Sequence, residues 1–206
     1  MRRAIELDPT YEAPKVDLAF AYLALGAIDE GAAGLAAAWE SGFRSAVSWL
    51  GNFMVLVMSD RLDEARRFAA ASQLNDDGKA ILARFIDVQA GGSDASLVDD
   101  IVASTAIAYQ FKIWMLSRMG DHDAAMNYIA FRLDNDYLLD ARPLWGPGTD
   151  LFTHPDFPAL VERLGLVDYW QATDWGLFCR PGTDAFVCDG SGRSDDAVEA
   201  LLSGDR

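Results

Sequence analysis

The sequence predicts an all-α fold of packed helical hairpins, and three observations lead to this prediction. The segment Ala27–Gly31 recurs as Arg61–Ala65, at an offset of 34 residues. Each copy carries an Asp-Glu pair just after a break in an apolar run, where carboxylates stabilise the start of a helix. Apolar side chains of the first unit then recur at helical spacing: Val16, Ala19, Phe20 and Leu23. A fixed period of this length is typical of helical repeat arrays.

The period and the side chains at fixed positions resemble the tetratricopeptide repeat, which has a 34-residue period and a W-x2-L-G-x2-Y…A-x3-F pattern. The matching positions are Lys15, Leu18, Ala19, Tyr22, Gly31 and Leu35; Trp49, Asn52, Phe53, Leu56, Ala65 and Ala69; and Tyr109, Lys112, Ile113, Leu116, Ala125 and Ile129. Lys15, Asn52 and Lys112 depart from the pattern. The resemblance implies a tetratricopeptide-like superhelix over residues 1–137.

The chain starts in the middle of a repeat, because Ala4–Pro9 falls on the end of a repeat's second helix. This indicates either a fragment of a longer protein or a truncated cap. We expect Arg2–Leu7 to be a helical remnant, with Ile5 and Leu7 packed on the first full unit.

Three helical hairpins are predicted within the array. They pair Glu12–Leu25 with Glu30–Glu40, Ala46–Met58 with Leu62–Gln73, and Ala106–Met119 with Asp123–Leu133. The segment 46–58 is apolar nearly all round, which predicts burial on several sides.

Residues 79–105 predict a degenerate unit between the second and third hairpins. A helix from Ala80 to Val88 is broken by two glycines, and another runs over Ala95–Ser104 with Ser93 or Asp94 as its N-cap. Because this unit is shortened, we expect a local kink.

After residue 137 the composition changes, and residues 138–178 predict a C-terminal helical cap. Arg142–Gly148 reads as a turn-rich linker, Thr153 as a helix N-cap, and Gly165 as a helix stop before a short helix over Leu166–Thr173. Residues 179–206 form a loop-rich tail.

This region resembles a module at the ends of bacterial regulators that join a repeat array to a winged-helix DNA-binding domain or an adenylate cyclase. The side chains that carry the resemblance are Phe152, His154, Pro155, Phe157, Leu164, Gly165, Leu166, Tyr169, Trp170, Phe178, Cys179, Arg180 and Pro181. The resemblance implies the sensing or interaction end of a protein of signalling or transcription regulation, without its output domain.

The charge is strongly acidic, at −15 overall, with the excess concentrated after residue 90. No Lys/Arg cluster is present, which argues against a nucleic-acid partner. The acidity fits a solvated face or attraction of a basic partner. The longest uncharged run, Ser45–Ser59, is shorter than the ~20 residues of a membrane span, and no signal peptide is visible.

Two cysteines, Cys179 and Cys188, are spaced for a small disulfide-closed loop or stand as unrelated thiols. The family resemblance favours the disulfide. A disulfide would place the chain in the periplasm, and free thiols would place it in the cytoplasm.

Candidate catalytic chemistry is absent from the sequence. Neither a nucleophile motif nor a phosphate loop occurs, and no cofactor is predicted. His122 and His154 lie in different units, so no metal site is predicted. We therefore expect a non-enzymatic chain, with a hydrolase of unrecognised site as the remote alternative.

The remaining candidate site is a binding groove formed by the first helix of each hairpin, as the repeat resemblance implies. Its residues are Phe20, Leu23, Leu50, Met54, Val57, Gln110, Trp114 and Arg118. An exposed groove of this composition indicates a protein or peptide partner and a scaffold role. The alternatives are burial of these residues by neighbouring helices or by the cap, and a small-molecule pocket between array and cap, ringed by Trp114 and Met54.

Overall fold

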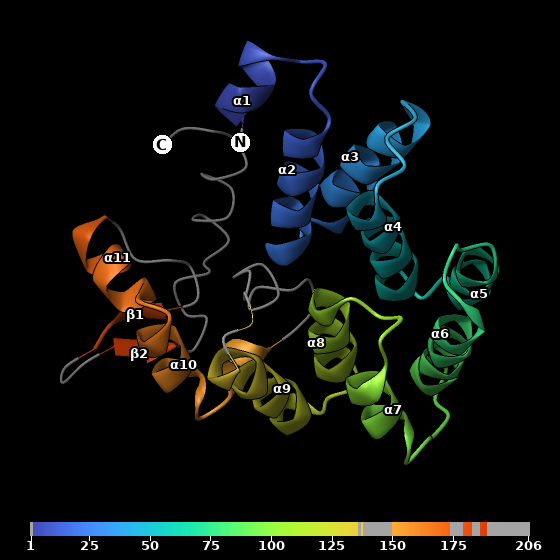
Figure 1. Ribbon diagram of the computed structural model, residues 1–206. Coiled ribbons are helices and arrows are strands. Elements are labelled where there is room, and N and C mark those ends of the chain that lie inside the picture. Colours follow the sequence, from blue (N-terminus) through green and yellow to red (C-terminus); the bar gives the residue numbers. More distant parts are fainter. Residues whose placement is uncertain (1, 136, 138–149, 174–178, 183–185, 189–206) are drawn as a thin grey trace.

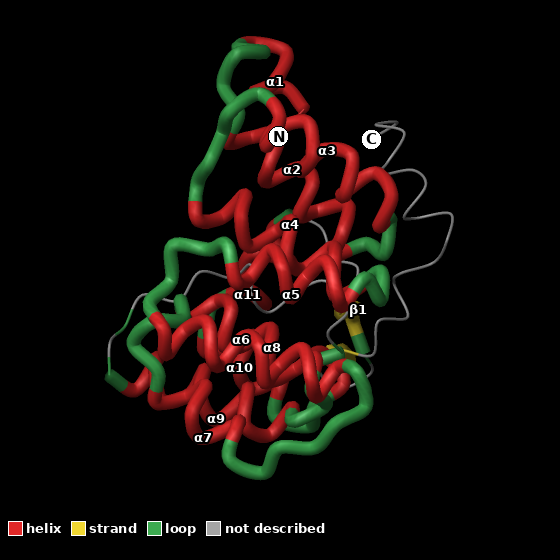
Figure 2. Tube along the Cα trace, turned by 90° about the vertical axis from the view of Figure 1, so that its right-hand side faces the viewer, coloured by secondary structure: helices red, strands yellow, loops and turns green. Residues whose placement is uncertain are grey.

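The computed structural model describes residues 2–135, 137, 150–173, 179–182 and 186–188, and most of these are helical, which confirms the all-α prediction. Figure 1 shows the helices in chain order along a curve, from α1 at the top through α5 and α6 on the right to α10 and α11 on the left. Figure 2 gives a side view, in which α1 to α4 lie above α6 to α10 and the strands of the described residues form one short hairpin. The helices of the array are α1 (Arg2–Leu7), α2 (Ala13–Ala24), α3 (Ile28–Glu40), α4 (Ala46–Met58), α5 (Leu62–Ala70), α6 (Asp76–Gln89), α7 (Leu97–Ala103), α8 (Tyr109–Arg118) and α9 (His122–Asp134). The C-terminal elements are η2 (Leu151–Thr153), α10 (Phe157–Arg163), α11 (Leu166–Ala172), β1 (Cys179–Pro181) and β2 (Phe186–Cys188).

The three predicted hairpins are all present, because α2 packs on α3, α4 on α5 and α8 on α9. No strand interrupts residues 12–133, every one of which the structure describes. Two boundaries differ from the prediction by three residues, and the others by two or fewer. Helix α5 ends at Ala70, short of Gln73, and α8 begins at Tyr109, after Ser104 Oγ accepts a hydrogen bond from the Ala106 amide in the preceding turn.

Helix α4 is buried from several directions, as its apolar sequence predicts. Its Phe53, Met54 and Val57 belong to the main hydrophobic core, whereas Val55 belongs to a smaller core around Leu23 and Leu35. Phe20 of α2 packs against both cores. Helix α4 therefore joins the first hairpin to the rest of the molecule.

Small residues occur where the helices of a hairpin approach most closely. Ala19, Ala65 and Ala125 are all buried, as the repeat pattern predicts. In the first hairpin the position of Ala65 and Ala125 is taken by Gly31, and a Cβ there would lie 2.5 Å from Leu23 Cδ2. The first hairpin is therefore packed too closely for a methyl group at this position.

The predicted helix stop at Gly165 is confirmed, and a second glycine, Gly26, ends α2 in the same way. Gly26, after α2, has φ 82°, and Gly165, after α10, has φ 68°. Both lie in the left-handed region, which glycine adopts without a Cβ clash.

The degenerate unit forms α6 and α7, but its predicted N-caps are wrong. The N-cap residue of α7 is Ser96, whose side chain makes no capping bond. Asp94 accepts a hydrogen bond from the Ser96 amide and is also bound to an arginine of α6, so it stabilises the loop before the helix. Ser93 is exposed in the same loop.

Lys112, a departure from the repeat pattern, has a structural explanation next to this unit. Its side chain is 5% exposed, and its Nζ donates a 2.8 Å hydrogen bond to the Val102 carbonyl near the end of α7. Nζ also lies 5.2 Å from the ring centroid of Tyr128 on α9. Lys112 thus satisfies a helix-end carbonyl that would otherwise lack a partner.

At the N-terminal end, α1 is a helix that contacts α2, in agreement with the predicted remnant. Ile5 is partly buried. The expected packing of Leu7 is wrong, because this side chain is 70% exposed. Leu7 is the last residue of α1 and the chain turns away at Asp8–Tyr11, where Asp8 binds Thr10.

The C-terminal cap contains the predicted helices α10 and α11, but Thr153 is not the N-cap. Thr153 ends the 3-10 helix η2 and donates its hydroxyl to the Asp150 carbonyl, while Asp156 precedes α10. The cap is tied to α9 by His154 Nε2, which lies 2.9 Å from Asp123 Oδ1. Since His154 Nδ1 accepts from the Asp156 amide, Nε2 carries the proton in this arrangement. The predicted linker Arg142–Gly148 lies outside the described residues.

Replacing Gly31 by alanine should destabilise the protein by about 1 to 3 kcal/mol, because the added methyl overlaps Leu23 and lies 3.0 Å from the Ala19 carbonyl oxygen. This loss opposes the gain of about 1 kcal/mol that alanine gives in a helix interior. Denaturant unfolding measures the change. The control is Gly34→Ala, whose Cβ would lie 3.0 Å from Ala19 Cβ and 3.8 Å from Ala19 Cα, a less severe overlap than at Gly31. Equal or higher stability of Gly31→Ala relative to Gly34→Ala would contradict the close packing.

Candidate functional site

Half of the predicted groove is buried in the core. Leu23 is 0% exposed, Met54 and Val57 are each 3% exposed, and Trp114 is 1% exposed. The prediction that these four side chains line a water-exposed groove is therefore wrong. The physical reason is that α4 and α8 are covered by neighbouring helices, so the side chains assigned to the groove pack inside the array.

The other four predicted residues keep partial access to solvent: Phe20, Leu50, Gln110 and Arg118. They come from α2, α4 and α8, the first helices of the three hairpins. Phe20 is fixed by close contact with α4, since its Cζ lies 3.0 Å from where a Cβ on Gly51 would stand. Leu50 follows Trp49 on α4 and packs at the margin of the main core.

Arg118 is the most unusual of these four. It is the last residue of α8 and only partly exposed, and its Nε atom is buried. Within the part of the chain that the structure describes, Nε has no hydrogen-bond partner. A buried donor without an acceptor costs about 1–3 kcal/mol, and such groups are rare in native proteins.

A cationic and aromatic surface lies on the same hairpin and was not predicted. The Arg132 guanidinium of α9 lies 3.9 Å from the ring centroid of Tyr109 and 5.2 Å from that of Tyr137. Tyr137 is 53% exposed, and Phe131 beside it is 54% exposed. Tyr109 directly precedes Gln110 on α8. The spacing of apolar residues along the sequence gave no signal for this stacking. Tyr109 lies on α8, Arg132 on α9, and Tyr137 after the end of α9.

A chain of aromatic rings fills the centre of the array. It starts at Trp39 on α3, where the Arg44 guanidinium lies 4.0 Å from the ring, and continues inward through rings 5.3 to 6.5 Å apart. The rings in sequence of contact are Trp39, Phe68, Trp49, Phe53, Phe111, Trp114 and Phe85. Three of them, Phe53, Phe85 and Phe111, contact the ring of Trp114 at centroid distances of 5.4 to 6.5 Å.

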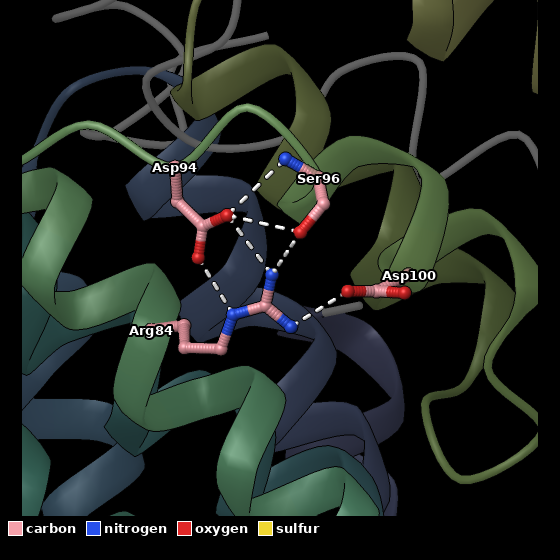
Figure 3. A network of polar contacts seen from close by, with 4 residues as sticks. All are labelled: Arg84, Asp94, Ser96 and Asp100. Atoms are coloured by element: carbon pink, nitrogen blue, oxygen red, sulfur yellow. Dashed lines mark hydrogen bonds and ion pairs between the residues drawn. The ribbon is translucent and has the colours of Figure 1, made fainter.

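Arg84 of α6 organises a polar cluster that ties α6 to the start of α7 (Figure 3). Its Nε donates to Asp94 Oδ2 at 2.6 Å, and its Nη2 donates to Asp94 Oδ1 at 3.0 Å. The remaining contacts are from Nη1 to Asp100 Oδ2 at 2.7 Å and from Nη2 to Ser96 Oγ at 2.8 Å. Two parallel bonds from one guanidinium to one carboxylate are the stronger form of such a pair.

The cluster has a clear electrostatic consequence. The hydrogen bonds from Arg84, with those from Ser96, lower the pKa of the Asp94 carboxyl to about 2. The same carboxylates raise the pKa of Arg84 above its ordinary value. This arrangement holds both groups charged at neutral pH and is suited to joining the helices, not to transferring a proton.

Lys112 is affected in the opposite direction. Burial, followed by the nearby positive charge of Arg132, lowers the pKa of the Lys112 ammonium. Because its Nζ already donates to Val102 and faces the Tyr128 ring, this lysine is enclosed between α7, α8 and α9.

The predicted pair Cys179 and Cys188 forms a disulfide, with Cα atoms 4.0 Å apart on opposite strands of the β1–β2 hairpin. Cys179 is 1% exposed and belongs to the main core. Phe186 packs on the same core, which also contains Trp170.

The described residues hold no group of three His, Cys, Asp or Glu side chains placed to ligate a metal ion. None of the helices in the same described part has the length and apolar content to cross a membrane. His122 starts α9, where the side-chain cap comes from Asp121, which accepts from the Ala124 amide.

Comparisons with protein-family models, with curated proteins and with solved structures found no match to this chain.

Replacing Asp94 by asparagine should lower the stability of the protein at pH 6, because Arg84 then loses its bidentate carboxylate. The native pKa of Asp94, about 2, lies below the unfolded value of about 3.9. Its stabilisation is therefore complete above the unfolded pKa and is lost as pH falls through the native pKa. The stability difference between wild type and Asp94→Asn should be constant above about pH 5 and should shrink toward pH 2.

Denaturant unfolding at several pH values measures this difference. The control is Asp99→Asn, on an exposed side chain in the first turn of α7, which should show no comparable pH-dependent difference. A difference for Asp94→Asn that stays the same down to pH 2 would refute the pairing.

Proposed function

We propose that the chain is a non-catalytic interaction or sensing module that binds a protein or peptide segment alongside α2, α4 and α8. The observation that carries this proposal is the unsatisfied Nε of Arg118. Because Nε is buried, the partly exposed Arg118 side chain would have to turn outward to bring this donor to a partner's oxygen atom. The new hydrogen bond would then recover the free energy that burial of the unpaired donor costs. Partly exposed Phe20 and Leu50 supply apolar contact area, and Gln110 supplies a second hydrogen-bonding group.

The succession of packed hairpins supports the same proposal. An array in which each hairpin contacts mainly its neighbours offers the equivalent helix of several units to one extended partner. The resemblance to the tetratricopeptide repeat and to the ends of bacterial regulators suggests a role in signalling or transcription regulation. In this proposal the chain binds the partner, and a separate output domain responds to that binding.

The charge of the chain favours a basic partner. A net charge of −15 attracts a positively charged segment and raises its association rate. Such a segment can still satisfy Arg118 through a backbone carbonyl. The proposed partner is therefore an extended, lysine- or arginine-rich segment with apolar side chains at intervals.

The binding test uses phage-displayed random peptides selected on the whole chain, followed by calorimetry with the enriched peptides. Arg118→Gln and Gln110→Ala should each weaken these peptides about tenfold, which corresponds to about 1.4 kcal/mol. Both changes are on partly exposed polar side chains, and circular dichroism checks that the variants fold.

The matched control for Arg118→Gln is Arg66→Gln, on an exposed arginine of α5 that is paired with Asp87. It should leave binding unchanged. Peptides that bind wild type and Arg118→Gln equally well, or an enriched set without basic residues, would contradict the proposal.

The disulfide also suggests the cellular compartment in which the chain matures. Bridged cysteines persist in oxidising compartments and are rare in the cytoplasm, so we propose that the chain matures in the periplasm. Protein isolated from its native compartment, alkylated under denaturing conditions, should gain no alkyl groups until it is reduced. Intact mass measures this. Two thiols that are alkylated without reduction would place the chain in a reducing compartment instead.

A further inference from the structure

The β1–β2 hairpin is too short to be stable without help. Each strand has three residues, and they pair only with each other. Pro181, at the end of β1, has no amide hydrogen to donate. An isolated two-stranded hairpin is marginal in water even when its strands are longer. Other contacts must therefore hold these strands in place.

Two contacts do so, the disulfide and the docking on α10. Cys179 and Cys188 are paired opposite each other at the end of the hairpin away from its turn, so the bridge closes the open end. Strand β2 contacts α10, and Cys179 is buried in the core that contains Phe157, Val161 and Trp170. Figure 1 shows both strands beside α10 and below α11.

We propose that the Cys179–Cys188 disulfide is a redox latch whose reduction by a dithiol releases the β1–β2 hairpin and uncovers the apolar side of α10. The disulfide has its effect on the state in which the hairpin has come away from α10. It keeps the undocked strands in a closed loop with little conformational freedom. Once the bridge is reduced, the undocked strands gain the entropy of an open chain.

The step is a thiol–disulfide exchange that transfers two electrons and two protons to the cysteine pair. A thiolate of the dithiol attacks the sulfur of Cys188, because Cys188 is partly exposed and Cys179 is buried. The S–S bond breaks, Cys179 leaves and takes a proton, and a mixed disulfide forms on Cys188. The second thiol of the reductant then displaces Cys188, which leaves as a thiol, and the reductant becomes a cyclic disulfide.

The apolar side chains of α10, which β2 contacts, and Trp170 of α11 are buried in the bridged state. Phe157 and Val161 are 0% exposed, and Leu160 and Trp170 are each 7% exposed. An apolar surface of this kind in water favours association with another apolar surface. Release of β2 would expose the part of α10 that it contacts, and only under reducing conditions.

Hydrogen exchange of the whole chain, with and without dithiothreitol, tests the latch. Closing a loop of this length restricts the open state about a hundredfold. Reduction should therefore speed amide exchange in β1, β2 and α10 by up to about a hundredfold, and should leave the amides of α4 unchanged. The variant Cys179→Ala/Cys188→Ser should exchange like the reduced protein, with or without dithiothreitol.

Two results would overturn the proposal. Unchanged exchange in the hairpin and α10 after reduction would show that the docking does not depend on the bridge. Faster exchange in α4 as well would show that the bridge stabilises the whole chain, and not a separable hairpin. Neither result bears on the peptide-binding test, because that test uses the bridged protein and residues of α8.

Discussion

Burial of α4 between two hydrophobic cores is the constraint on which the rest of the structure depends. One side of this helix supplies Phe53, Met54 and Val57 to the main core, and Val55 contributes to the core of the first hairpin. A fully buried side chain of this size contributes roughly 1.5–3 kcal/mol, whereas an exposed ion pair contributes about 0–1 kcal/mol. Apolar packing around α4 therefore outweighs surface ion pairs such as that of Arg66 with Asp87. The polar contacts decide how neighbouring elements are joined.

The sequence predicts those parts of the fold that depend on neighbours in the chain. The 34-residue offset aligns Gly31 with Ala65, the repeat pattern places Ala19, Ala65 and Ala125 in the interior, and helix ends follow from local residues such as Gly26 and Gly165. Contacts between distant residues are not predictable in this way. The bond from Lys112 to Val102 and the stacking of Arg132 on Tyr109 bring together side chains from different helices, and neither leaves a periodic trace in the sequence.

The candidate groove shows the same limit for a functional site. A repeat register states which side of a helix a residue occupies. It does not state what covers that side. In this chain the aromatic residues of α4, α5 and α8 pack against one another, and Met54, Val57 and Trp114 of the predicted groove are part of the core. Gln110 and Arg118 remain partly accessible at the two ends of α8.

The separate hydrophobic core of the first hairpin bears on the order in which parts of the protein unfold. Val16, Ala19, Leu23, Leu35 and Ala38 pack with one another, and their link to the main core runs through Phe20 and α4. Three sets of contacts join the first hairpin to the main core: Phe20 with α4, α3 with α4, and Trp39 of α3 with Phe68 of α5. Opening of α2 and α3 ahead of the larger core would require the loss of all three. The residues proposed to bind a partner lie on both sides of this junction.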